Sequence, residues 1–434
     1  MSRPDQHRRL QADQAPPASA GIAAALPIPV RRHANARRIV CVIGTRPEAI
    51  KMAPVIRRLK QEPWCECIVL CTAQHRELLD QVLELFSIIP DADFGVMRPN
   101  QTLSGLTSRL IESFDEFLSS HRPDALLAQG DTTTAMAAAL CSFYHRVPFG
   151  HVEAGLRTGN LYGPFPEEMN RMVAARIARW HFAPTQEAGR NLLREGIVPA
   201  AVRVTGNTVI DALLQVSEQC SDEPLSPGLR LVLVTAHRRE NFGRPLENIC
   251  RAIRHLAERR ADIRFLYPVH PNPNVRRVVF DALAGHPRIA LVDPLEYRAF
   301  VAAMKQAHFI LTDSGGVQEE APALGKPVLV LRDETERPEA LAAGVVRLVG
   351  TSFEKIVAES TRLLDDCAYY AAMARGVSPY GDGHAAQRIA ALLKKDLCGA
   401  PDADEDEDEK SSAGLVCIAQ PSAEPVPLSA AAPS

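Results

Sequence analysis

The sequence has few aromatic residues, little net charge and no long apolar run. Among its 434 residues, 5% are aromatic and 46% are hydrophobic, which is typical of a globular protein with a mostly aliphatic core. No apolar run reaches the roughly 18 residues that a membrane helix needs, so we expect no membrane partner. The length is sufficient for two domains of ordinary size.

The small net charge of −3 conceals two charged ends. Residues 1–37 are rich in arginine, whereas residues 399–434 hold an acidic block at 402–409 and then a stretch rich in alanine, proline and serine. We expect both ends to be disordered. The body between them, 38–398, is balanced in charge, so it offers no basic surface and we expect no nucleic-acid partner.

Paired cysteine motifs are also lacking. The ten cysteines show no repeated spacing that would indicate a metal site or a disulfide framework. We interpret them as reduced thiols in a cytoplasmic protein, and we expect no metal and no cofactor. The apolar segment 20–30 resembles a signal peptide, but Pro27, Pro29 and the Arg31-Arg32 pair argue against it. A disordered arm, or a start codon placed too early, explains residues 1–37 better.

Apolar strands alternate with amphipathic helices along the body, and the pattern restarts after the linker-like segment SDEPLSPG at 221–228. This predicts an α/β protein in which two Rossmann-type domains, 38–210 and 211–377, face each other across a cleft. The segment 378–398 is expected to form a last helix that packs back across the domains. Strands are predicted at 38–43, 68–71, 125–128, 147–151, 229–235, 264–269, 289–292, 309–311, 328–331 and 345–349. Helices are predicted up to 60, at 76–86 and 103–118, and from 167 to 180.

The stretch from Leu311 to Leu331 reads as a strand end, a turn, a helix and a second strand. Ser314, Gly315 and Gly316 form the turn, and Gln318 is expected to open the helix. Unpaired backbone N–H groups and the positive end of a helix dipole make such a turn a seat for phosphate. Glu320, one turn later, is placed to accept hydrogen bonds from a ribose. The alternative is an ordinary turn whose glycines only permit tight packing.

Polar side chains gather at the carboxyl ends of the predicted strands in both halves. They are Arg46, Lys51, Asp131, Glu153 and Glu167, followed by His237, Arg238, Arg239 and Arg337. Each has a simpler explanation as a helix cap, a loop ion pair, a core histidine or a solvated charge. Because the carboxyl ends of parallel strands share one edge, we expect them to lie together. Three acids and a histidine that face cations and a phosphate seat suit proton transfer beside a diphosphate leaving group.

A series of sequence blocks occurs in one order from 38 to about 395. It includes GTRPEAIKMAP, TAQHRELLDQVLELF, QGDTTTAMAAAL, GHVEAGLRTG, PEEMNR, HRRENFGRPLENI and LTDSGGVQEEAPALGKPVLVLRDETERPEA. Together they resemble the non-hydrolysing UDP-N-acetylglucosamine 2-epimerases. The resemblance implies a GT-B-like fold with the nucleotide sugar between two Rossmann-type domains. It implies reversible conversion of UDP-GlcNAc to UDP-ManNAc and, by analogy, a homodimer.

The resemblance also implies roles for matching residues. The acid–base set around the sugar would be Asp131, Glu153, Glu167 and His237. The substrate contacts would be Arg46, Lys51, Phe300 at uracil, Ser314, Gly315 and Gly316 at the diphosphate, Glu320 at the ribose, and Arg337. A second UDP-GlcNAc, acting as an activator, would lie beside Gln74, His75 and Arg76. Gln129 receives no role, because some relatives have a histidine at that position.

The chemistry has its own logic. The proton at C2 is not next to a carbonyl, so its direct removal would be too costly. The hypothesis is elimination of UDP to a 2-acetamidoglucal, then re-addition with protonation on the opposite face, inside a cleft that retains both fragments. Which of Asp131, Glu153 and Glu167 is the first base stays open. The product is expected to supply a surface polysaccharide such as an exopolysaccharide.

Three other functions fit parts of the pattern. A glycosyltransferase of the same fold would pass the sugar to an acceptor, a hydrolysing epimerase would release free ManNAc, and a non-catalytic sensor would only bind the nucleotide sugar. The transferase would not need acid–base groups on both faces of the sugar, and the sensor would need none of them. The joint presence of three acids and a histidine therefore favours the epimerase.

Overall fold

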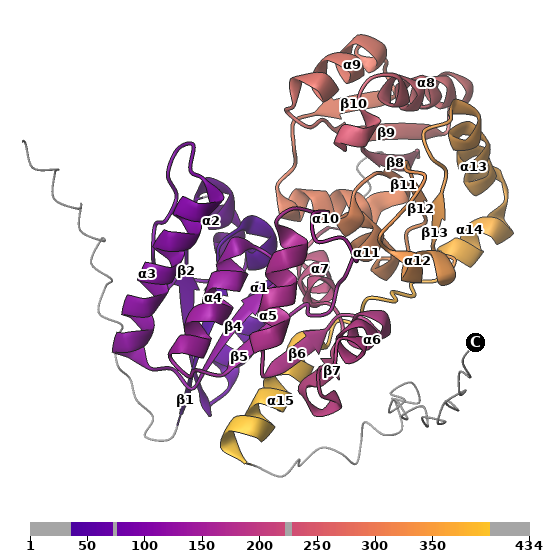
Figure 1. Cartoon of the computed structure of the whole chain (residues 1–434). Coiled ribbons are helices and arrows are strands. Elements are labelled where there is room, and N and C mark those ends of the chain that lie inside the picture. Colours follow the sequence, from indigo (N-terminus) through magenta and orange to yellow (C-terminus); the bar gives the residue numbers. More distant parts are fainter. Residues whose placement is uncertain (1–35, 73–75, 222–227, 400–434) are drawn as a thin grey trace, which may run out of the picture.

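The computed structural model describes residues 36–72, 76–221 and 228–399, and side chains 76–78 are left out of the description. Within this part of the chain, two parallel sheets form, a seven-stranded sheet ordered β3-β2-β1-β4-β5-β6-β7 and a six-stranded sheet ordered β10-β9-β8-β11-β12-β13 (Figure 1). The fold is therefore the GT-B-like pair of α/β domains that the sequence predicts.

The first sheet and its helices precede the second in the chain. Its strands are β1 (Arg37–Ile43), β2 (Cys65–Cys71), β3 (Ala92–Asp93), β4 (Ala125–Gln129), β5 (Phe149–Val152), β6 (Trp180–Ala183) and β7 (Val202–Val204). Its helices are α1 (Arg46–Gln61), α2 (Arg76–Leu85), α3 (Leu103–His121), α4 (Thr133–Tyr144), α5 (Glu167–Ile177), α6 (Gln186–Arg194) and α7 (Thr208–Glu218), with the short 3-10 turn η1 (Pro199–Ala201).

The second sheet follows the same alternation. Its strands are β8 (Arg230–Thr235), β9 (Ile263–Pro268), β10 (Ile289–Val292), β11 (Ala307–Thr312), β12 (Val328–Val330) and β13 (Val346–Leu348). Its helices are α8 (Arg244–Arg259), α9 (Pro273–Leu283), α10 (Tyr297–Gln306), α11 (Gly315–Ala323), α12 (Pro338–Ala342), α13 (Phe353–Asp365), α14 (Cys367–Met373) and α15 (Ala385–Cys398), with the 3-10 turn η2 (Arg239–Asn241).

Side-chain caps begin the helices that leave the carboxyl edge of the first sheet. Thr45, Thr132, Thr185 and Asn207 stand at the N-caps of α1, α4, α6 and α7, and each accepts a hydrogen bond from a backbone N–H of the first turn. A cap of this kind stabilises a helix by about 1 kcal/mol. The caps fix four helix N-termini at one edge of the sheet, which is where ligands bind in folds of this type.

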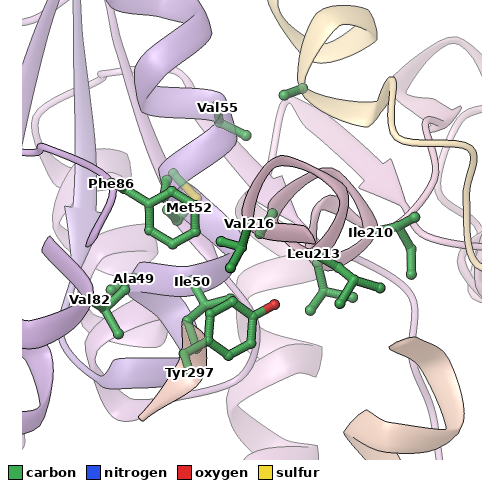
Figure 2. Packing of buried hydrophobic residues seen from close by; sticks show 14 of the residues in the cluster. Ala49, Ile50, Met52, Val55, Val82, Phe86, Ile210, Leu213, Val216 and Tyr297 are labelled. Atoms are coloured by element: carbon green, nitrogen blue, oxygen red, sulfur yellow. The ribbon is translucent and has the colours of Figure 1, made fainter. Parts of the chain in front are cut away.

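Helix α7 lies between the two sheets. It packs against α1 on one side and against α10 and α11 on the other, in one cluster of buried apolar side chains that reaches both sheets. Figure 2 shows Met52 of α1, Leu213 and Val216 of α7 and Tyr297 of α10 in this cluster. The expected boundary between residues 210 and 211 falls inside this continuous helix.

Helix α15 follows the second sheet in the chain but packs on α1 and α7, beside the first sheet (Figure 1). The carboxylate of Asp211 accepts hydrogen bonds from the backbone N–H groups of Ala385 and Ala386, at 3.2 and 2.8 Å. The indole of Trp180 donates to Asp396 at 2.6 Å. These contacts attach the end of the chain to the domain that begins it.

Three predicted helix limits were wrong by three residues, and the first is the helix predicted at 103–118, which continues to His121. The helix that begins at Glu167 ends at Ile177, because Arg179 donates its backbone N–H to Phe149 and Trp180 starts a strand paired with β5. The helix of the phosphate seat begins at Gly315 and includes both glycines, three residues before the expected start at Gln318. The last residue of the expected N-terminal arm, Arg37, opens β1 by pairing with Cys65.

None of the helices in the described ranges combines the length and apolar character that crossing a bilayer requires.

Candidate active site

The phosphate seat lies where β11 meets α11. Ser314 does not cap the helix with its side chain, and its own backbone N–H donates to Thr312 at 2.9 Å. A Cβ atom on Gly315 would lie 3.4 Å from the guanidinium carbon of Arg337 and 3.7 Å from a nitrogen of Arg238. Two arginines therefore flank the amino end of α11. Their charges and the helix dipole together make this helix end suitable for a diphosphate.

The buried carboxylate of Asp313 shapes the turn that carries His237. Its Oδ2 atom accepts from the backbone N–H groups of His237 and Arg238, both at 2.8 Å, and from the Asn241 amide at 3.0 Å. The Nδ1 atom of His237 lies 3.4 Å from Oδ1, and its ring stacks on that of His270. Burial lowers the pKa of His237, against the charge of Asp313, so the neutral imidazole is favoured.

Glu153 accepts hydrogen bonds from three side chains of the site. It follows β5 in the left-handed conformation, with a φ of 63°. Its Oε1 atom accepts from the ammonium of Lys51 at 2.5 Å and from the Asn207 amide at 3.1 Å, and its Oε2 atom accepts from Gln129. Burial raises the pKa of Glu153, but the charges of Lys51 and Arg337 and the hydrogen bonds from Lys51 and Asn207 together outweigh burial and leave the pKa below its ordinary value. Glu153 is therefore a fixed carboxylate anion.

Glu319 on α11 is a second buried carboxylate, and it connects this helix to Asn207. The same amide nitrogen that donates to Glu153 also donates to Glu319, at 3.2 Å. The other oxygen of Glu319 accepts from Arg337 at 2.7 Å. A chain of hydrogen bonds thus runs from Lys51 in the first domain to the guanidinium beside the phosphate seat in the second.

Asp131 and Glu167 have fewer partners than Glu153. One oxygen of Asp131 accepts from Arg171 at 2.5 Å, and its backbone carbonyl accepts from Asn170 at 2.9 Å. Burial raises the pKa of Asp131 even though Arg171 lowers it. The half-buried carboxylate of Glu167 makes no hydrogen bond or ion pair with any described residue, whereas its neighbour Glu168 accepts from the backbone at Thr158 and Gly159.

Glu320 faces α10 from the second turn of α11. It accepts a 2.7 Å hydrogen bond from the hydroxyl of Tyr297, one turn before the half-buried Phe300. Burial raises the pKa of Glu320 to about 7, while Lys51 and Arg46 favour its ionised form. A carboxyl group in this state is able to donate or accept a hydrogen bond near neutral pH.

Glu48 fixes the turn between β1 and α1 through hydrogen bonds. Its two oxygens accept from the backbone N–H of Gly44 at 3.0 Å and from the Thr132 hydroxyl at 2.6 Å. A Cβ atom on Gly44 would lie 2.7 Å from the hydroxyl oxygens of Thr72 and Thr134. A side chain at this position of the turn that presents Arg46 and Lys51 would therefore displace one of these hydroxyl groups.

The structure joins part of the predicted set directly. One hydrogen-bond chain contains Lys51, Glu153 and Arg337. The charges of this chain contribute to the pKa shifts of Asp131 and Glu320. Asp313 links His237 to the phosphate seat, because it accepts a hydrogen bond from the backbone of His237 and directly precedes Ser314. Gln74 and His75 lie outside the described residues, and Arg76 is placed only as the first residue of α2.

Sequence reasoning missed several residues that complete the site. They are Gln129, Arg171, Asn207, Tyr297, Asp313 and Glu319. Four of them had a usable signal, since each stands next to a residue or turn already selected: Gln129 before Gly-Asp, Asn207 at a strand end, Asp313 before Ser-Gly-Gly and Glu319 before Glu320. Arg171 and Tyr297 lie inside ordinary helices, where a sequence alone does not distinguish them.

The nine described cysteines form no disulfide bond with one another, and the sulfur atoms of Cys67 and Cys41 lie 3.8 Å apart. The described residues contain no group of three or more histidine, cysteine, aspartate or glutamate side chains arranged to hold a metal ion.

Comparison with known proteins gives consistent matches along the chain. The family model described as UDP-N-acetylglucosamine 2-epimerase matches residues 57–394. The UDP-N-acetylglucosamine 2-epimerase of Escherichia coli strain K12 is 52% identical over 369 residues, covering 82% of this chain and 98% of that protein.

Two solved structures match over the same extent. The UDP-GlcNAc 2-epimerase from Neisseria meningitidis bound to UDP-GlcNAc gives a TM-score of 0.76 at 48% identity, over 82% of this chain and 100% of that one. The UDP-GlcNAc 2-epimerase of Methanocaldococcus jannaschii in complex with UDP-GlcNAc and UDP gives a TM-score of 0.69 at 32% identity, over 82% and 99% of the two chains.

Proposed function

The chain belongs to the UDP-N-acetylglucosamine 2-epimerase family and is an isomerase, and we propose that it inverts C2 of UDP-GlcNAc by eliminating and re-adding UDP. The observation that carries this proposal is the arrangement of the acids. Asp131 and Glu153, with opposite pKa shifts, lie near each other in a site that the Asn207 amide connects to the phosphate seat. The lowered pKa keeps Glu153 an anion, whereas the raised pKa of Asp131 leaves this group able to take up and release a proton, so the two carboxyl groups have separate roles.

In the elimination step, a carboxylate takes the proton from C2 while the bond from C1 to the diphosphate oxygen breaks. The electron pair of the C2–H bond forms the C1–C2 double bond, and the pair of the breaking bond stays on UDP. Re-addition reverses this flow, with the proton delivered to the other face of C2. A second acid on that face is therefore required.

Asp131 and Glu167 fit this exchange better than Glu153 does. Lys51, Gln129 and Asn207 already use the oxygens of Glu153, so it serves as a fixed anion that orients Lys51 toward the sugar. Asp131 has one uncommitted oxygen and a raised pKa, and Glu167 has no partner among the described residues.

Cations and backbone dipoles would stabilise the departing UDP. Arg337, Arg238 and the N–H groups of Gly315 and Gly316 converge on the amino end of α11. Preorganised donors of this kind are commonly worth factors of about 10² to 10³ in rate each. Neutral His237 is able to donate a hydrogen bond to the same leaving group.

The test is turnover of UDP-GlcNAc in D₂O, followed by proton NMR. The expected result is UDP-ManNAc with deuterium at C2 and deuterium entering the remaining UDP-GlcNAc. Product without deuterium would rule out elimination. Free ManNAc would indicate the hydrolysing reaction, sugar transfer to an added acceptor would indicate a glycosyltransferase, and an unchanged substrate would indicate a sensor.

We also propose a homodimer that forms through α4. This helix packs between α3 and α5 (Figure 1) and exposes Phe143 and Tyr144, each 63% accessible. Met136 and Leu140, both half-buried, continue the same stripe at helical spacing. Exposed aromatic residues in such a stripe are typical of protein contacts.

Tyr144→Glu is expected to give a monomer in sedimentation velocity, whereas Val198→Glu, at another exposed apolar position, should leave the dimer intact. If both variants remained dimeric, the result would contradict the proposal.

Regulation and pathway follow from the family resemblance. We propose that a second UDP-GlcNAc binds beside Gln74, His75 and Arg76 and activates the enzyme. A lag with UDP-ManNAc as the sole substrate, abolished by a trace of UDP-GlcNAc, is the expected result, and hyperbolic kinetics without a lag would contradict it. We further propose that the protein acts in the cytoplasm, where its cysteines stay reduced, and supplies UDP-ManNAc for an exopolysaccharide.

A further inference from the structure

We infer that Asn207 is a positioning residue that holds the acid–base site together only while the two domains are closed on each other. Its amide nitrogen donates to Glu153 at 3.1 Å and to Glu319 at 3.2 Å, and these carboxylates belong to different domains. The inference rests on the proposed elimination, because it concerns how the cleft retains the intermediate.

Every hydrogen-bonding group of Asn207 is used. The residue is 2% exposed. Its backbone N–H donates to the carbonyl of Tyr380 at 2.6 Å, in the segment that returns from the second domain, and its side-chain oxygen caps α7 by accepting from Val209 at 3.1 Å. The two amide protons then remain for Glu153 and Glu319. Among side chains of this length, only asparagine has both an oxygen that accepts the cap hydrogen bond and two N–H donors. Serine and aspartate offer the acceptor but lack the two donors.

The charges around Asn207 explain why a neutral amide stands there. Lys51 neutralises Glu153, and Arg337 neutralises Glu319. Two carboxylates that approach one point repel each other unless a donor lies between them, and a third cation would leave the buried group with excess positive charge. An amide donates a directional hydrogen bond to each carboxylate without adding charge.

Separation of the two domains would break one arm of this bridge. Asn207 precedes α7 and keeps its contact with Glu153 inside the first domain, so separation of the sheets removes its bond to Glu319. A second hydrogen bond between the domains, from the Thr185 hydroxyl to Glu339 at 3.0 Å, involves neither Glu153 nor Glu319. The Asn207 bridge is therefore the cross-domain contact that includes a member of the acid–base set, Glu153.

The test compares Asn207→Ser with wild type and with Ser352→Asn. Serine caps a helix about as well as asparagine, so Asn207→Ser keeps the cap of α7 but removes the bridge. Ser352→Asn makes the reverse exchange at the cap of α13, away from the cleft. During turnover of UDP-GlcNAc, Asn207→Ser should release free UDP and 2-acetamidoglucal about tenfold more often per product than wild type. The kcat should fall by a similar factor while KM changes less, and Ser352→Asn should match wild type.

A second measurement separates this inference from the elimination mechanism. Small-angle X-ray scattering with saturating UDP should give a larger radius of gyration for Asn207→Ser than for wild type. Equal radii, or a variant that loses thermal stability without added UDP release, would overturn the role of Asn207. Absence of deuterium in the wild-type product would overturn the elimination instead, and the scattering comparison would still decide the bridge.

Discussion

Replacement of Lys51 by methionine tests the buried charge pair at the centre of the site. The ammonium lies 2.5 Å from Glu153, and the two side chains are 19% and 6% exposed. Loss of one partner of a buried ion pair leaves the other uncompensated and costs about 3–5 kcal/mol. Because Gln129 and Asn207 still bond to Glu153, we expect the lower end of this range. In a domain of this size, about 3 kcal/mol lowers the melting temperature by roughly 6–12 °C.

The sign of the pH dependence follows from the pKa of Glu153. Lys51 holds this pKa below the ordinary value of 4.5 in the folded protein, so the stabilisation is present above pH 4.5 and is lost as the pH falls. In Lys51→Met the buried carboxyl protonates more easily. The difference in melting temperature between variant and wild type should therefore be largest at pH 7.5 and smaller near pH 5.

The assay is differential scanning fluorimetry at both pH values, with two matched variants. Lys60→Met removes an exposed lysine from the same helix and should melt like wild type. Lys51→Met combined with Glu153→Gln removes both charges and should recover most of the stability without recovering epimerase activity. A single variant that melts like wild type at pH 7.5, or a double variant no more stable than the single one, would refute the reasoning.

Three further predictions follow from individual contacts. The pKa of Glu320, raised to about 7 by burial, means that its stabilisation is complete below pH 4.5 and is lost as the pH rises through 7. Glu320→Gln should therefore remove a fall in melting temperature between pH 5 and pH 8, and an unchanged pH profile would contradict this. Gly44→Ala places a methyl group against the hydroxyls of Thr72 and Thr134 and should cost about 1–3 kcal/mol, measured by thermal unfolding; wild-type stability would show that the turn adapts. Asp131→Asn should lower kcat by about 10² to 10⁴ and slow exchange of the C2 proton in D₂O equally, whereas normal exchange would exclude Asp131 as an acid or base.

The order of elements and the edge that carries the site were predictable from the sequence. Buried parallel strands are continuous apolar runs, and helices that leave them carry caps such as Thr45 and Thr132, so both leave local signals. The glycines of the phosphate seat and the polar residues at the strand ends are local signals of the same kind. The early end of α5 was not predictable, because pairing of Trp180 with a distant strand ended the helix.

Only the tertiary structure decided which polar groups meet. Asn207 and Glu319 are far apart in sequence and lie in different domains, yet one amide joins the latter to Glu153. The structure likewise decided that Glu153 is a fixed anion while Asp131 has a raised pKa, since each depends on burial and on partners from other elements. Residue type and local pattern determine where a carboxylate stands in the chain, but its protonation depends on long-range packing, which places its counter-charges and removes its water.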